Sequence, residues 1–113
     1  MFGQMQPIGS RSVQFVNGRM SAEAYAMEDV IMYSCDALEH RPLRPGLADV
    51  YHKLAQQEEN HASLLADQLT ILFNELLNRN PELPPELMRK WGEHQNKVVK
   101  LRARGKLYTD LYK

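Results

Sequence analysis

Apolar residues recur at alternating steps of four and three along residues 46–79, a run without an internal proline. With no glycine after Gly46, this period predicts one continuous helix. Its predicted apolar face is formed by Leu47, Tyr51, Leu54, Glu58, His61, Leu65, Gln68 and Leu72. Glu58 and His61 thus stand in the middle of an apolar stripe, where burying a polar group costs free energy. The stripe therefore indicates chemistry as well as packing.

A second helix is predicted over residues 21–40, before the longer one. Ser21 suits the N-cap position, and the helix should end near His40 because Pro42 and Pro45 follow. Its predicted apolar stripe is Ala24, Glu28, Ile31, Cys35 and Leu38. Because the connection between the two helices is short, we expect an antiparallel hairpin.

A third helix is predicted to begin at Pro85, since proline is favourable at the first helical position. It should end near Arg104–Gly105. One face carries Leu87, Trp91, His94, Val98 and Leu101. On that face we interpret His94 as a packed core histidine rather than a metal ligand.

Residues 1–20 are predicted to form an extended N-terminal arm. Glycines, Pro7 and the Asn17-Gly18 pair argue against a helix there, and apolar and polar residues alternate around Val13 and Phe15. The arm is too apolar for a disordered leader, so we expect it to pack on its own domain or on a neighbour in a larger assembly. The remainder, 21–113, should form a single all-α domain.

Composition narrows the class of protein. At 113 residues one core is expected, and the 14 basic residues balance the 14 acidic ones. Residues 86–113 are basic, which fits a solvated helix beside an acidic neighbour; without a known motif, nucleic-acid binding is not expected. A single cysteine precludes an internal disulfide, and neither a membrane span nor a signal peptide is recognisable. We expect a cytoplasmic protein without a membrane partner.

The candidate chemistry lies in the helical hairpin. Glu58 and His61 are about one turn apart on one face, within reach of a common metal ion. Glu28 is the candidate third ligand, because Glu28 and Glu58 lie ~15 residues on either side of the loop and antiparallel helices would bring them to one level. Carboxylate oxygens and a neutral imidazole suit iron or manganese.

These residues resemble a known family. Glu28 is followed 30 residues later by Glu58 and then by His61-Ala62, and Gly46-Leu47-x-Asp49-Val50 leads into the long helix. Over residues 24–72 the chain is similar to the ferritin-like hairpin, most of all to the two-helix encapsulated ferritins. The resemblance implies a half-bundle that dimerises around a di-iron ferroxidase centre, with Glu28, Glu58 and His61 as metal ligands.

A structural interpretation of Glu58 and His61 stays open beside the metal site. A glutamate and a histidine in a helical seam can form a buried hydrogen-bonded pair that sets the register between helices. The sequence thus supports two functions, a ferritin-like iron-binding protein with ferroxidase activity and a non-enzymatic assembly or adaptor subunit. Both imply a homo-oligomer, because Leu64, Ile71 and Leu76 lie on faces that one hairpin cannot cover.

Overall fold

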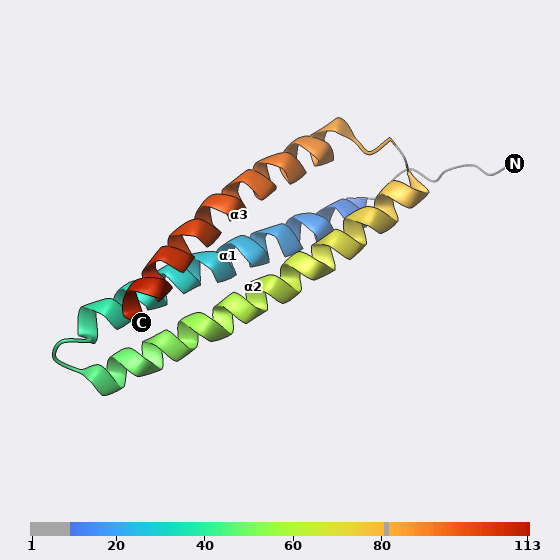
Figure 1. The fold of residues 1–113 in the computed structure, drawn as a ribbon. Coiled ribbons are helices and arrows are strands. Elements are labelled where there is room, and N and C mark those ends of the chain that lie inside the picture. Colours follow the sequence, from blue (N-terminus) through green and yellow to red (C-terminus); the bar gives the residue numbers. More distant parts are fainter. Residues whose placement is uncertain (1–9, 81) are drawn as a thin grey trace, which may run out of the picture.

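The computed structural model describes residues 10–80 and 82–113, which form three helices joined by two short connections (Figure 1). They are α1 (Ser10–His40), α2 (Pro45–Arg79) and α3 (Pro85–Tyr112). Within these residues no strand occurs, so the prediction of an all-α protein is confirmed. Residues 1–9 of the predicted arm lie outside the described residues.

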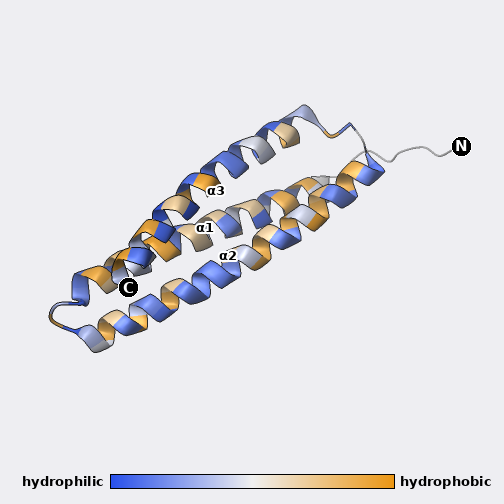
Figure 2. Cartoon of the chain, in the orientation of Figure 1, coloured by the Kyte–Doolittle hydropathy of each residue, from blue (hydrophilic) through white to orange (hydrophobic). Residues whose placement is uncertain are grey.

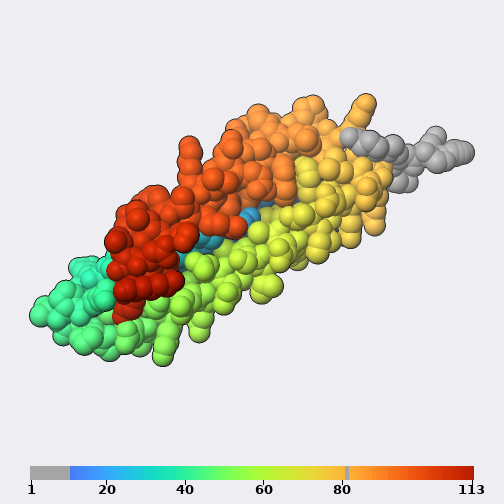
Figure 3. All heavy atoms as spheres, viewed as in Figure 1, coloured from blue at the N-terminus to red at the C-terminus, as the bar shows by residue number. Residues whose placement is uncertain are grey.

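The helices lie side by side along one axis, and the molecule extends 69 × 19 × 19 Å (Figure 1). α1 and α2 form the predicted antiparallel hairpin, and α3 packs along α1. α2 and α3 contact each other only slightly, so α1 is the central helix. In Figure 3 atoms of α1 are visible at the bottom of the furrow between α2 and α3.

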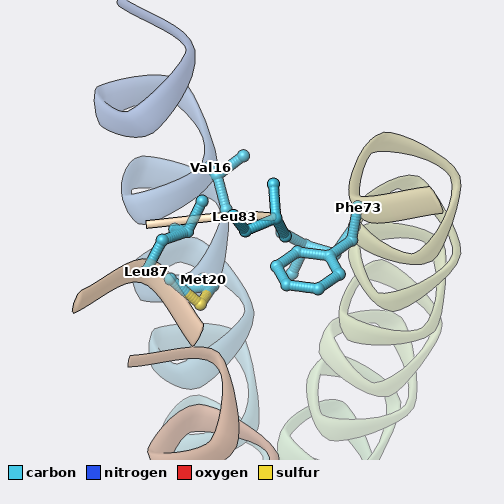
Figure 4. Packing of buried hydrophobic residues seen from close by; sticks show 6 residues of the cluster. Val16, Met20, Phe73, Leu83 and Leu87 are labelled. Atoms are coloured by element: carbon cyan, nitrogen blue, oxygen red, sulfur yellow. The ribbon is translucent and has the colours of Figure 1, made fainter. Parts of the chain in front are cut away.

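The main core lies at the open end of the hairpin, where all three helices and the second connection meet (Figure 4). Six buried residues form it: Val16, Met20, Leu69, Phe73, Leu83 and Leu87. The Trp91 ring stacks on Phe73 at a centroid separation of 4.1 Å and closes this core. A smaller cluster of Ala26, Met27 and Ala62 lies halfway along the hairpin. The two clusters fix the level of α1 against α2.

Residues 1–20 were predicted to form an extended arm, and the structure corrects this prediction for residues 10–20. α1 begins at Ser10 rather than at Ser21, and it runs through Asn17 and Gly18 without a break. Glycine in a helix interior costs about 1 kcal/mol, whereas burying an apolar side chain contributes about 1.5–3 kcal/mol. Val16 and Met20 are both buried in the main core, so tertiary packing outweighs the local turn signal.

The structure also corrects the predicted end of the third helix. α3 continues through Gly105 to Tyr112. A Cβ atom added to Gly105 would lie 3.1 Å from Cγ1 of Val30, so this glycine allows α3 to approach α1 closely. Beyond it, Tyr112 stacks on His52 and donates a hydrogen bond to Asp49. These contacts with α2 hold the last turns in helical form.

The predicted buried face of α2 is wrong by part of a turn. The buried residues of α2 are Ala48, Ala55, Ala62, Leu65, Leu69 and Phe73. Alanine at steps of seven lets α1 approach closely, and this narrow seam takes the place of the expected leucine stripe. On α1 the expected stripe is also wrong, since Glu28 and Cys35 are exposed. In the described part of the chain, no helix is both long and apolar enough to span a membrane.

Candidate functional site

The most buried ionisable groups join α1 to α3. Glu23 and His94 are 3% and 8% exposed, and His94 Nε2 donates a hydrogen bond of 2.7 Å to Oε1 of Glu23. The other carboxylate oxygen of Glu23 accepts a longer bond of 3.4 Å from the guanidinium of Arg102, which is half exposed. Each carboxylate oxygen therefore has a partner, as buried charges require.

This network was not predicted as a unit. His94 is buried as expected, but Glu23 was not among the residues predicted for the apolar face of its helix. In the observed helix Glu23 lies on the face that also carries Val16, Met20 and Met27, at steps of four, three and four. That period was available in the sequence, and a helix starting at Ser10 would have revealed it. The network links α1 to α3 across their contact.

Two of the three predicted metal ligands come together on α2. Nδ1 of His61 lies 3.6 Å from Oε2 of Glu58, as the i, i+3 spacing requires. The His61 side chain is 58% exposed and the Glu58 side chain 30% exposed. The prediction that both occupy the buried seam of one chain is therefore wrong, because the alanine seam has turned them toward solvent.

Glu28, the third predicted ligand, is exposed on α1. Ala26, Met27 and Ala62 share a cluster, so Glu28 does lie near the level of Glu58 and His61, as expected. Nevertheless, in residues 10–80 and 82–113 no three histidine, cysteine, aspartate or glutamate side chains form a group that could hold a metal ion. A single copy brings together two donors of the predicted site and leaves the third apart.

A second heptad pattern runs along the exposed side of α2, and apolar residues recur along the whole helix (Figure 2). We call it the outer seam. Its members, at alternating steps of three and four, are Leu47, Val50, Leu54, Gln57, His61, Leu64, Gln68, Ile71 and Glu75. Val50, Leu64 and Ile71 are 51%, 68% and 59% exposed. Four members, among them Leu54 and His61, also belong to the stripe that was predicted to be buried. The predicted stripe therefore includes parts of two faces of α2, the face packed on α1 and the exposed face.

A hollow opens on the hairpin where α1 begins and α2 ends, and no residue of α3 lines it. Its volume is about 640 Å³. Phe15, Leu72 and Leu76 supply apolar walls, and three arginines, Arg11, Arg19 and Arg79, line it together with Glu75. The guanidinium of Arg19 lies over the Phe15 ring, 5.4 Å from its centroid. Among the described residues, the hairpin is thus hollowed at its open end and apolar along the exposed side of α2.

Comparison with known proteins supplies no relative for this fold. No family model matches the chain, and no curated protein or solved structure matches it.

Proposed function

We propose that this chain is a helical assembly subunit, a protein that acts by packing the outer seam of α2 against another helix. The observation that carries the proposal is the exposure of Val50, Leu64 and Ile71 at heptad spacing on a helix whose opposite face is already buried. A helix with apolar residues on two faces fits a structure in which both faces are covered. Polar members of the seam, such as Gln57 and Gln68, fit an interface in which register matters.

The proposal is tested by placing a charge in the seam. Leu64→Glu would bury a carboxylate in the interface, so we expect the assembly to dissociate while the fold of the single chain is retained. Gln56→Glu is the matched control, because it adds the same charge to an exposed position of α2 off the seam. Size-exclusion chromatography with light scattering gives the mass, and circular dichroism reports the helical content.

We expect the wild type and Gln56→Glu to share a mass above the 13.1 kDa of one chain, and Leu64→Glu to be smaller. A 13.1 kDa wild-type particle at micromolar concentration, or an unchanged mass in Leu64→Glu, would overturn the proposal.

A second candidate function is iron binding with ferroxidase activity, and a specific observation favours it. Glu58 lies 3.6 Å from His61, a member of the outer seam, so packing a second copy on the seam would double the number of donors there. Two carboxylates and two imidazoles would then meet, and Glu28 would join them if the copies bring it into reach. Such oxygen and nitrogen donors suit iron or manganese.

The metal proposal is tested by thermal melts under anaerobic conditions, with and without ferrous iron. A metal that binds the folded state stabilises it, so iron should raise the melting temperature of the wild type and of a His40→Ala control. In His61→Ala the shift should disappear, together with any iron-dependent oxygen consumption by the wild type. A wild-type melt that neither iron nor manganese changes would remove this candidate.

A further inference from the structure

We infer that the partner of the outer seam is a second copy of this chain, packed with its α2 antiparallel to the first and with a twofold axis beside residue 59. This inference rests on the proposed function, since it names the partner and register of the same surface. Three features of the described residues support it: the match of the seam with itself, the direction of charge along α2, and the fit of the connecting loop.

The register is selected by how the outer-seam residues of one copy pair with those of a second copy. In a symmetric antiparallel coiled coil, each core position of one helix faces a core position of the other helix across the twofold axis. With the axis beside residue 59, two positions face each other when their residue numbers sum to 118. Leu47 then faces Ile71 of the second copy, and Leu54 faces Leu64. Val50 faces Gln68, a pair of one apolar and one polar residue, and Gln57 faces His61, a polar pair. Twofold symmetry repeats every pair, so eight contacts line the interface.

Charge along the exposed side of α2 favours the antiparallel direction. Lys53 flanks the first half of the seam, and Asp67 flanks the second half. Both are exposed, and neither has an ion-pair partner within 4.0 Å among the described residues. In the inferred register, Lys53 of each copy flanks Asp67 of the other. A parallel pairing would instead place Glu75 against its own copy in the core of the interface.

The loop between α1 and α2 fits the end of the same seam. Position 75 faces position 43 of the second copy, so Glu75 meets the loop that carries Arg41 and Arg44. Leu43 is 87% exposed in this loop and would come next to the last turns of the seam. A register shifted by one heptad would place Glu75 against Val50 of the second copy, and Lys53 would no longer lie near Asp67 of the second copy. The register centred on residue 59 is therefore the one in which charge and apolar contacts agree.

The register also leaves one like-charge pair, Glu58 with Glu58 of the second copy, beside the axis. Each of these carboxylates has its own His61 at 3.6 Å, which carries the opposite charge when protonated. The interface is thus least favourable at its centre and most favourable at its two ends.

Cysteine cross-linking tests the register. In a Cys35→Ser background, Leu54→Cys combined with Leu64→Cys places the two thiols on facing positions of different copies. Within one helix the same positions are about 15 Å apart, too far for a disulfide. Leu54→Cys combined with Ile71→Cys is the matched control for the register shifted by one heptad. We expect mild oxidation to give a covalent dimer with the first pair and much less with the second.

Charge reversal tests the direction. Lys53→Glu and Asp67→Lys should each weaken association roughly threefold to tenfold, as exposed ion pairs allow when each is repeated by symmetry. The combined variant should return to within about twofold of the wild type. The two residues are 14 positions apart on one helix, so rescue requires a contact between copies. Sedimentation at several concentrations gives the dissociation constants.

The outcomes separate this inference from the proposed function. Covalent dimer from the 54/64 pair together with charge rescue supports the inferred register. If Leu64→Glu dissociates the assembly but the 54/71 pair cross-links as well or better, or no charge rescue occurs, the inferred dimer is wrong and the assembly function stands. A wild type that is monomeric overturns both.

Discussion

Glu23 shows how one residue can join two helices that are far apart in sequence. Its carboxylate is buried on α1, and both its hydrogen-bond partners, His94 and Arg102, come from α3. Such a network contributes little net stability compared with an apolar core, but it is costly to break, because the remaining partner is left buried and unpaired. The α1–α3 contact is therefore specific as well as apolar.

The first residue-scale prediction concerns this pair. Glu23→Ala should lower the free energy of unfolding by about 1–3 kcal/mol, since His94 loses its acceptor in a buried position. Replacing both residues, Glu23→Leu with His94→Leu, should recover most of that loss, because an apolar pair of similar size needs no partner. Urea denaturation followed by circular dichroism measures both. A double variant weaker than Glu23→Ala would show that the pair itself is stabilising.

A second residue-scale prediction concerns Tyr112 at the end of α3. The hydrogen bond to Asp49 raises the pKa of Tyr112 above its usual value, with burial and the negative charge of Asp49 acting in the same direction. A raised pKa means that the contact stabilises the fold below the ordinary tyrosine pKa and that this contribution is lost as the pH rises through the higher value. Asp49→Ala should lower the Tyr112 pKa. Ultraviolet titration, with Tyr112→Phe to identify the signal, would show it, and an unchanged titration would contradict the contact.

At the scale of elements, the positions of small residues determine where α2 and α3 approach α1 closely. The alanines of α2 set a close approach to α1, and Gly105 does the same for α3 at Val30. α3 also contains Gly92, which is exposed and has no neighbour within 4 Å of an added Cβ. Close packing thus requires a glycine at position 105 but not at position 92.

These two glycines give a matched pair of substitutions. Gly92→Ala should stabilise the protein by about 0.5–1 kcal/mol, because alanine restricts the unfolded chain and favours the helix. Gly105→Val should destabilise it by about 1–3 kcal/mol, since the new side chain must displace Val30. Thermal melts compare the two. Equal effects would mean that α3 does not approach α1 as closely as the 3.1 Å distance requires.

At the scale of the whole molecule, three helices cover one another incompletely. α1 is covered by two neighbours, but no helix of residues 10–80 and 82–113 covers the outer seam of α2. If association covers this seam, folding and association are linked, and the melting temperature depends on protein concentration. We expect the wild-type melting temperature to rise over a hundredfold range of concentration and that of Leu64→Glu to stay constant. A constant wild-type value would indicate that the seam stays uncovered.

The amino-acid sequence determined the number of helices, the hairpin and most helix ends. Period, proline and chain length act locally, so the ends at His40 and Arg79 and the start at Pro85 fall where they were predicted. α2 begins at Pro45, one residue before the predicted start at Gly46. The start of α1 and the end of α3 were missed, because Asn17-Gly18 and Gly105 are helix-breaking signals that burial of Val16 and close contact with Val30 override.

Only the tertiary structure decided which face of each helix is inside. α2 carries apolar residues over more than half of its circumference, so periodicity alone allows several orientations. The alanine seam faces α1 because small side chains permit the closest backbone approach, and this rotates His61 outward. For the same reason Glu23 and His94 became a buried pair, while Glu28, Glu58 and His61 did not form one group. A local sequence pattern determines that a helix forms, whereas the complementarity of two surfaces determines which face of the helix is buried.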